Sequence, residues 1–436
     1  MGPKLRAKIA SGRRNSGAGG AGGCTPQGGE EGRTGGAECG GREEVTRPDT
    51  SGVARGSLGC TGLRYPAYDI YGAVHDGAVL RARRVLAVNR GMTFLWKFLK
   101  RNKFAALYSI GDDAPSIFFE IWYTSANSSI RSRARDLAVI LTAKLETRLL
   151  ARPAVLLASD AQRDEFFTFM FMLRSQAEMS VDTSLLMAAA DASWARNGFS
   201  DTTVLYGCSR EDLVGVSTEA WLELLMRILI MEYNNLVLFQ NRFPCTFGLH
   251  DAFSALRHVK LSSFDSSDEG KYQDSFYLAT HIVYAISAYS GIKTHEKDVP
   301  WLYRYLRRSL LHWMRQAQRK RKDPSVYVDV DGVGEIADLL RGLGLSETTD
   351  KMVCTCTDWL LATQQEDGSW PVWFNAGDSS DKHDYYDRMH STWVCTQALR
   401  DRDFKVNEKQ VQKWKTHMAK LLSSSQLRKL AYKCTW

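Results

Sequence analysis

The stretch Trp359–Trp373 reads WLLATQQEDGSWPVW and decides how the rest of the chain is interpreted. Its first residues form an apolar run typical of one face of a helix, and the run stops at a Gln-Gln-Glu-Asp-Gly-Ser-Trp sequence. Gly368 can adopt the positive φ that ends a helix, and Pro371 cannot continue one. We therefore predict that an outer helix ends here and that the chain turns inward to begin another helix.

Two polar or aromatic side chains give this turn a structural role. Gln364 can satisfy backbone groups at a neighbouring helix end, and Trp370 can stack over the junction. Neither role involves chemistry. The stretch is therefore expected to shape the fold and not to react.

Four segments in the second half of the chain follow one plan. Each has a polar or glycine-containing lead-in, one His or Glu, and then a short apolar helix, and longer amphipathic helices lie between them. The distance along the chain from Glu335 to His390 is typical of one helical hairpin, and that from His281 to Glu335 is nearly the same. The segments are FGLHDAFSALRHV (247–259), LATHIVYAISAYSGI (278–292), DVDGVGEIADLLRGLGL (329–345) and DRMHSTWVCTQALRD (387–401).

The residues Trp359, Leu360, Gln364, Gly368 and Trp370 resemble the QW repeat motif of the α/α-toroid superfamily, which contains terpenoid cyclases and protein prenyltransferases. The resemblance implies an all-α fold in which inner and outer helices form a ring of hairpins. Few stretches of the chain alternate with the period of a strand, which also favours an all-α protein.

The expected organisation has three parts. Residues 1–62 are rich in glycine and poor in large apolar side chains, so we predict a disordered tail. Residues 63–158 are expected to form an N-terminal helical segment, and residues 159–436 the toroid-like domain. The sequence does not indicate whether the N-terminal helices complete the ring.

Composition narrows the compartment and the partners. The formal charge is +8, but the basic residues are scattered, and the run at 318–323, QRKRKD, is expected to be a solvated helix end. Nine cysteines without a regular framework fit a reducing compartment. No apolar run is long enough to cross a membrane. We expect a cytoplasmic protein (or an organellar one, if the tail is a transit peptide) that does not bind nucleic acid. The oligomeric state is left open.

The shared position of His250, His281, Glu335 and His390 in the repeats suggests a metal site. If the ring closes, these side chains converge, and three imidazoles with one carboxylate suit zinc or a similar divalent ion. The alternative is that each His merely caps a helix start or bonds a carbonyl group.

Two further acids precede His390 in the sequence DYYDRMH. Asp384 and Asp387 can serve as metal ligands or fix the tautomer of the imidazole. Asp387 is also a candidate catalytic acid, and Asp384 a candidate residue of the substrate cavity. The resemblance to protein prenyltransferases also implies an Asp-x-Cys element, and this sequence lacks one.

An acid-initiated reaction is the second hypothesis. Class II terpenoid cyclases use an Asp-x-Asp-Asp motif whose middle Asp protonates an alkene, and by resemblance Asp329 and Asp331 occupy that pattern, with Gly332 in place of the last Asp. Asp331 and Glu335 are therefore candidate catalytic residues. The alternative is an ordinary helix-entry loop with an N-cap.

Aromatic side chains are available to line a central cavity. Trp393, three residues beyond His390, and Tyr284 are the candidates. Together these features favour an enzyme that acts on a small apolar, isoprenoid-like molecule in a lyase, isomerase or cyclase reaction, assisted by a metal or an acid. The alternative is a non-enzymatic helical scaffold that binds a peptide or lipid in its concave face.

Overall fold

The computed structural model describes residues 77–101, 104, 110, 113–151, 157–197, 202–264, 269–323, 325–371, 385–404 and 408–423. The chain divides into two compact units, Arg6–Arg64 and the remainder, Met1–Leu5 with Tyr65–Trp436. All described residues belong to the second unit. The tail predicted for residues 1–62 lies outside the described residues.

The described part of the chain is all-helical, as the sequence predicts. Its residues form no strand, and one isolated bridge joins Ser125 to Arg402. The α-helices are α2 (Gly77–Arg101), α4 (Ser116–Thr124), α5 (Ser128–Leu150), α6 (Asp160–Glu178), α7 (Ser184–Asn197), α8 (Thr202–Tyr206), α9 (Thr218–Tyr233), α10 (Leu249–Leu256), α11 (Glu269–Ile286), α12 (Pro300–Lys320), α13 (Val330–Gly342), α14 (Lys351–Thr363), α15 (Tyr385–Leu399) and α16 (Glu408–Ser423). Short 3₁₀ or π segments are η3 (Asp212–Gly215), η4 (Asn234–Leu238) and η5 (Glu296–Asp298).

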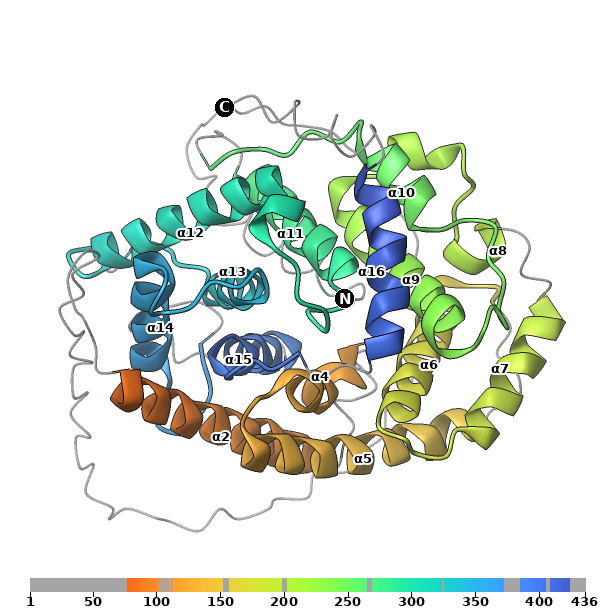
Figure 1. The fold of residues 1–436 in the computed structure, drawn as a ribbon, viewed down its shortest axis with the longest axis horizontal. Coiled ribbons are helices and arrows are strands. Elements are labelled where there is room, and N and C mark those ends of the chain that lie inside the picture. The colour runs from red at the N-terminus through yellow and green to blue at the C-terminus, as the bar shows by residue number, and fades with distance from the viewer. Residues whose placement is uncertain are drawn as a thin grey trace, which may run out of the picture. The chain divides into compact units, whose positions relative to one another are not determined.

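Helices α13 and α15 pack side by side and are seen nearly end-on in Figure 1, with α12, α14 and α2 around them. Helix α11 contacts α13, and α4 contacts α15. Helices α2 and α4 come from the segment expected to precede the toroid-like domain, yet both pack on α15. Helices from both expected segments therefore support the same inner pair.

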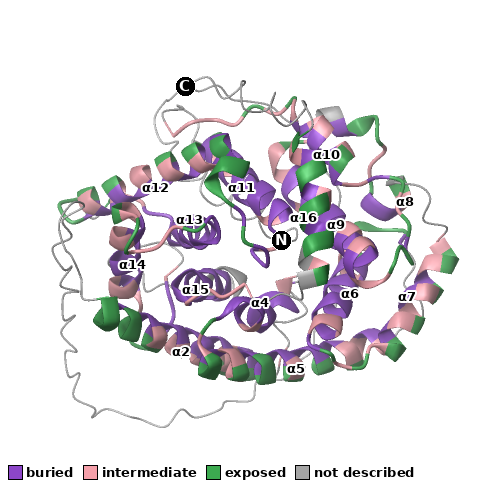
Figure 2. Cartoon of the chain, viewed as in Figure 1, coloured by how far each residue is buried: buried purple, intermediate pink, exposed green. Residues whose placement is uncertain are grey.

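Burial separates the helices into two kinds. Every residue of α13 is buried, and Figure 2 shows α13 and α15 almost entirely in the buried colour. Helix α12 is amphipathic: its apolar face is buried, whereas Arg304, Arg308, Arg315 and Arg319 are exposed. An all-buried helix next to amphipathic ones is the pattern of an inner and an outer layer.

Two glycines allow α13 to lie close to its neighbours. A Cβ atom on Gly332 would lie 2.7 Å from the ring of Phe276 on α11. A Cβ atom on Gly334 would lie 2.9 Å from Val394 on α15. Because both distances are shorter than real Cβ contacts, larger residues here would push α13 away from both helices.

The turn after α14 has the structural role that the sequence predicts, with one correction. Gly368 has a positive φ of 94°, as expected. The helix, however, ends at Thr363, so Gly368 belongs to the turn that follows and is not the residue that stops the helix. Its missing side chain matters because a Cβ atom would lie 2.5 Å from the carbonyl oxygen of Arg90 on α2. The turn therefore packs directly on α2.

Gln364 and Trp370 fasten this turn. The Gln364 amide donates to the carbonyl oxygens of Ala87 and Gly368, at 2.9 and 3.0 Å. Ala87 lies inside α2, so the partner is not the helix end that we expected. The buried Trp370 indole donates to the carbonyl of Leu360 at 2.8 Å and so satisfies one of the last carbonyls of α14.

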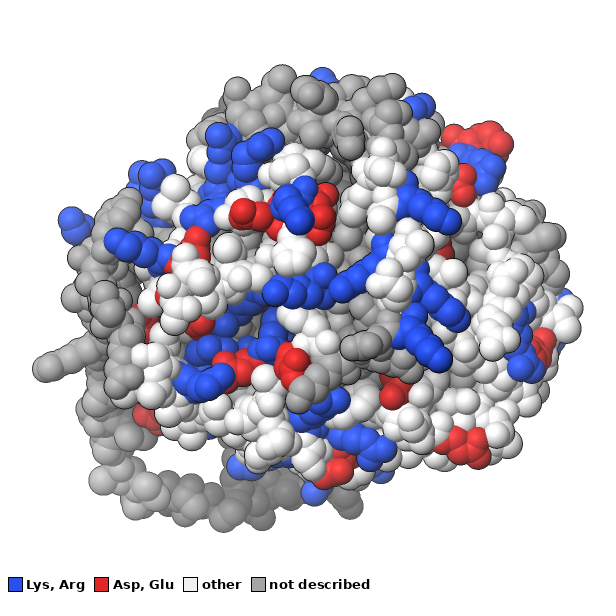
Figure 3. Space-filling view, viewed as in Figure 1, with Lys and Arg blue, Asp and Glu red and all other residues white. Residues whose placement is uncertain are grey.

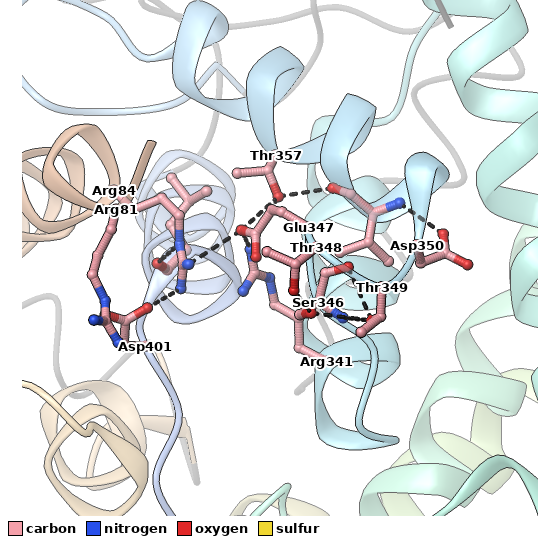
Figure 4. Close-up of polar contacts among 12 residues, drawn as sticks. Arg81, Arg84, Arg341, Ser346, Glu347, Thr348, Thr349, Asp350, Thr357 and Asp401 are labelled. Carbon is pink, nitrogen blue, oxygen red and sulfur yellow. Dashed lines mark hydrogen bonds and ion pairs between the residues drawn. The ribbon is translucent and has the colours of Figure 1, made fainter. Parts of the chain in front are cut away.

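A polar network fixes the C-terminal end of α13 (Figure 4). Arg341 donates to Glu347 and, at 3.0 Å, to Thr357 of α14. Arg84 of α2 bridges Glu347 and Asp401, at 3.2 and 2.6 Å. The network therefore ties α13, α14 and α2 together at one end of the inner layer.

Charged side chains of both signs are spread over the face in Figure 3. The basic run at 318–323 ends α12, where Arg319, Arg321 and Lys322 are exposed. Among the described helices, none combines the length and the apolar character needed to cross a membrane.

Candidate functional site

Three side chains of α13 and α15 meet in the interior. Asp331, Glu335 and His390 are all buried, and one ligand-type atom from each lies within 4.8 Å of the others. We call these three residues the acid–base centre. Asp331 and Glu335 are one helical turn apart on α13, so they lie on the same face, and His390 faces them from the first turns of α15.

Asp331 and His390 form a buried ion pair. His390 Nδ1 lies 2.8 Å from Asp331 Oδ1. Burial disfavours the imidazolium, but the charge and the hydrogen bond of Asp331 outweigh it and raise the pKa of His390 to about 9. At neutral pH the proton therefore lies on His390. Asp331 holds the His390 ring in one orientation. Asp384 and the side chain of Asp387, the other candidates for this role, lie outside the described residues.

Tyr277 of α11 joins the two acids of the DVD sequence. Its hydroxyl lies 3.0 Å from Oδ2 of Asp329 and 3.0 Å from Oδ2 of Asp331. Burial and the charges of these two carboxylates raise the pKa of Tyr277, so it stays a hydrogen-bond donor. Asp329 is the N-cap of α13, because its Oδ1 accepts from the Gly332 N–H at 3.0 Å. The first acid thus starts the helix, and the second, Asp331, pairs with His390.

Glu335 is held in a neutral form. Burial and the charge of Asp331 raise its pKa to about 8. Thr280 Oγ1 lies 2.7 Å from Glu335 Oε2 and 2.7 Å from the carbonyl oxygen of Tyr277. The Thr280 hydroxyl has one hydrogen, and where it donates to Glu335 it favours the ionised form, but this effect is smaller than that of burial and of the Asp331 charge.

His281 lies beside this centre as a neutral imidazole. Its Nδ1 is 2.8 Å from the carbonyl oxygen of Tyr277, so Nδ1 carries the hydrogen and Nε2 carries the lone pair. Burial lowers the pKa of His281 to about 4 despite this hydrogen bond. No described residue hydrogen-bonds Nε2, so this atom is available as a base or a ligand.

Polar or aromatic residues recur on α11, α13 and α15 at a spacing of three or four residues, which sorts them into three layers. Asp331 contacts Tyr277 and His390, and seven residues later Asp338 contacts Ser290 and Arg400, so the three helices run in the same direction. The first layer holds Tyr277, Asp331 and His390; the second holds His281, Glu335 and Trp393; the third holds Tyr284, Asp338 and Gln397.

The third layer is dominated by ion pairs. Asp338 accepts from Arg400 at 2.8 Å and from Arg402, and all three side chains are buried. We call these three residues the arginine cluster. Burial disfavours the Asp338 carboxylate, yet the two guanidinium groups hold its pKa below its usual value. Asp338 is therefore ionised, three residues after the neutral Glu335.

Guanidinium groups also hold a strained turn at the end of α11. Ala288, Tyr289 and Ser290 all have positive φ, between 49° and 59°, which costs about 1–2 kcal/mol per residue. Arg174 donates to the carbonyl oxygen of Ala288 at 3.1 Å, and Arg402 lies 3.4 Å from that of Ser290. The third layer is therefore built to hold the backbone in place.

The remaining predicted site residues are not all brought together. His250 is exposed on α10, whose apolar face packs toward α9 and η3, so the structure does not bring it to the acid–base centre. Asp384 lies outside the described residues, as does the side chain of Asp387. Trp393 is buried, with its ring 5.4 Å from that of His390. Tyr284 is half-buried, with its ring 5.9 Å from that of His281.

Sequence reasoning missed Tyr277, Thr280, Gln397 and Glu120 of α4. Glu120 is buried, accepts from the Gln397 amide at 2.6 Å, and has a pKa raised by burial to about 7. A usable signal was present for Tyr277. Polar or aromatic residues recur at i, i+4 and i+7 on the otherwise apolar α11 and α13, which places them on one face.

Two kinds of chemistry are compatible with the acid–base centre. The donors, one imidazole and two carboxyl groups, are ligands of first-row divalent ions such as zinc. Equally, the proton-carrying His390 and Glu335, next to the neutral His281, are a set of acids and a base. Comparisons with protein families, curated proteins and solved structures find no match to this chain.

Proposed function

We propose that this protein is an enzyme that moves protons on a small apolar, isoprenoid-like substrate, in an isomerase or lyase reaction. The observation that carries the proposal is the buried Asp331–His390 pair, 2.8 Å long, beside the neutral Glu335. Buried acids and bases with displaced pKa values are typical of catalytic sites.

The fold that we propose for this enzyme is an α/α toroid. Support comes from the all-buried α13 among amphipathic neighbours and from the QW-type turn after α14. In such a ring, the inner helices α11, α13 and α15 face a common central space. The three polar layers would then line the substrate site.

The proposed reaction adds one proton to the substrate and removes another from it. His390 or Glu335 donates a proton to one carbon of a double bond, which leaves positive charge on the other carbon, and His281 Nε2 takes a proton from the next carbon along, so the double bond moves by one position. Bonds and charges balance without an oxidant or a reductant. General acid–base catalysis works best with groups whose pKa values lie near the working pH, and the values of about 9, 8 and 4 bracket neutrality.

A cyclase reaction started by Asp331 has less support than an isomerase or lyase reaction. That role needs a protonated Asp331, whereas the raised pKa of His390 places the proton on the imidazole. Trp393 and Tyr284 would pack against the apolar part of the substrate and stabilise positive charge on it.

A deuterium-exchange assay tests the proposal. Purified protein is incubated in D₂O with isoprenoid alcohols, aldehydes and diphosphates of increasing length, and products are analysed by mass spectrometry. We expect deuterium at carbon in at least one substrate, and a loss of at least about 100-fold in D331N. The exposed Asp182→Asn variant is the matched control. Folded protein that labels no substrate, or D331N with the wild-type rate, would overturn the proposal, and binding without turnover would favour the scaffold.

A metal-dependent reaction is the second candidate, and the 4.8 Å grouping of the Asp331, Glu335 and His390 ligand atoms favours it. A divalent ion there would displace the protons of Glu335 and His390, so its binding should release protons. Calorimetry with Zn²⁺ in two buffers of different ionisation enthalpy measures this release. Wild-type heats that match those of the H390Q variant would exclude a metal at this centre.

A further inference from the structure

A partly open cavity of about 370 Å³ lies between α2 and the turn that follows α14. We call it the α2 cavity. Its lining shares no residue with the acid–base centre or with the arginine cluster, so neither of these accounts for it. Its volume falls within the range of pockets that hold small molecules, roughly 300–1,000 Å³.

Hydrogen bonds hold the walls of the α2 cavity in place. Arg90 Nη2 donates to the carbonyl oxygens of Gln365 and Glu366, at 2.8 Å each, and so ties the turn to α2. On the α2 side, Arg133 of α5 donates to Thr93 Oγ1 at 2.8 Å. The cavity is therefore preformed and does not need a ligand to shape it.

The apolar part of the lining is aromatic. Phe94 and Phe98 line the cavity, and their rings are stacked, with centroids 5.7 Å apart and an angle of 27° between the planes. Phe94 is buried, whereas Phe98 is half-buried, so part of Phe98 remains accessible. A planar aromatic group of a ligand can extend this stack.

Two cations border the cavity. Lys97 and Arg101 are one helical turn apart on α2, both are exposed, and neither forms an ion pair within the described part of the chain. The helix dipole favours cations in the last turn of α2, but this applies equally to Lys100, which is exposed and does not line the cavity. Lys97 and Arg101 can therefore bind one phosphate group from two sides.

The turn supplies two carboxylates. Asp367 Oδ1 accepts from the N–H and the hydroxyl of Ser369, at 3.0 and 2.6 Å, so Asp367 serves the turn itself. Glu366 is exposed, and none of the residues that the structure describes donates a hydrogen bond to its carboxylate. A carboxylate accepts hydrogen bonds only, so it favours a ligand that carries donors such as hydroxyl groups.

We propose that the α2 cavity binds a nucleoside monophosphate. The phosphate group lies between Lys97 and Arg101, the base packs on Phe98, and Glu366 accepts hydrogen bonds from the ribose hydroxyls. Inorganic phosphate would use the two cations alone, and an apolar acid would leave Glu366 without a donor. A nucleotide uses all three features. This inference goes beyond the proposed function and does not rest on it.

Calorimetry on the full-length protein with three probes tests the inference. AMP carries the base, the ribose and the phosphate group, whereas adenosine lacks the phosphate group and inorganic phosphate lacks the rest. We expect AMP to bind at least about 10-fold more tightly than either. If inorganic phosphate binds as tightly as AMP, then the cavity holds an adventitious ion only. That result, or equal binding of AMP and adenosine, would overturn the inference.

Variants locate the binding site. Lys97→Gln and Arg101→Gln should each weaken AMP binding at least about 5-fold, whereas Lys100→Gln, the matched control, should leave it unchanged. Phe98→Leu keeps an apolar side chain without a ring, and should weaken the binding of AMP but not that of inorganic phosphate. Glu366→Ala should remove the preference for AMP over its 2′,3′-dideoxy form. Wild-type affinity for AMP in folded Lys97→Gln, or equal losses in Arg101→Gln and Lys100→Gln, would also overturn the inference.

Discussion

The acid–base centre and the arginine cluster share the buried helix α13, yet the pKa values of their carboxyl groups are shifted in opposite directions. Glu335 has a pKa raised to about 8, whereas Asp338, three residues later, has a pKa below its usual value. Both side chains are buried. Burial is therefore not what distinguishes the two positions.

The difference lies in the partners. Asp338 is paired with two guanidinium groups, which favour its ionised form, whereas Glu335 has a hydroxyl and a neighbouring negative charge. A buried carboxylate with full counter-charge is part of the framework. A buried carboxyl group without counter-charge keeps its proton and can exchange this proton with a substrate. Only this second kind of carboxyl group can act as a catalytic acid.

The largest expected effect comes from removing the counter-charge. Asp338→Asn leaves Arg400 and Arg402 buried and without an acid, and should lower the free energy of unfolding by about 3–5 kcal/mol. Urea denaturation at neutral pH measures it. A loss below about 1 kcal/mol would contradict the framework role of the arginine cluster.

The loss of free energy of unfolding in Asp331→Asn should be smaller and should depend on pH. The pKa of His390 is raised from 6.5 to about 9, so the ion pair stabilises the fold fully below about pH 6.5 and loses this effect as the pH rises through 9. The shift corresponds to at most about 3 kcal/mol. We expect the loss in D331N to be largest near pH 6 and to shrink toward pH 9, by urea denaturation at each pH. A loss that grows with pH would contradict the pairing.

Part of the acid–base centre could be predicted from the sequence, and part could not. The predicted all-α fold is confirmed for the described residues, and Glu335 and His390 do meet. His250 shares their place in the repeat but lies on a short helix whose apolar face turns it outward. A repeat pattern gives the position of a residue along its helix, but not the rotation of that helix toward its neighbours.

The pairing of Asp331 with His390 depends on such a rotation. It requires α13 to approach both α11 and α15, and Gly332 and Gly334 permit this because neither has a Cβ atom. The sequence shows these glycines, but their effect depends on which helices pack against them. Likewise, Glu120 joins the site from a helix that carries no repeat signal.

Glu335→Gln sharpens the comparison, because it should have the opposite sign to Asp338→Asn. The unfolded chain loses the Glu335 proton near the ordinary glutamate pKa of 4.5, whereas the folded chain keeps it to about pH 8. Ionisation of the unfolded state therefore lowers wild-type stability as the pH rises through this window. Gln removes the penalty, so E335Q should gain relative to wild type, by at most about 1.4 kcal/mol for each pH unit. A variant that loses stability across this window would show that Glu335 is ionised.

The smallest expected effect separates a hydrogen bond from a charge. Thr280→Val removes the hydroxyl that lies 2.7 Å from Glu335, and should lower the free energy of unfolding by about 1 kcal/mol. Because this hydrogen bond favours the ionised form of Glu335, its loss should raise the pKa of Glu335 further, which infrared spectroscopy of the buried carboxyl group can follow. Thr280→Ser keeps the hydroxyl and should change neither quantity. If Val and Ser shift the titration equally, then packing around Thr280, and not its hydroxyl, controls the proton on Glu335.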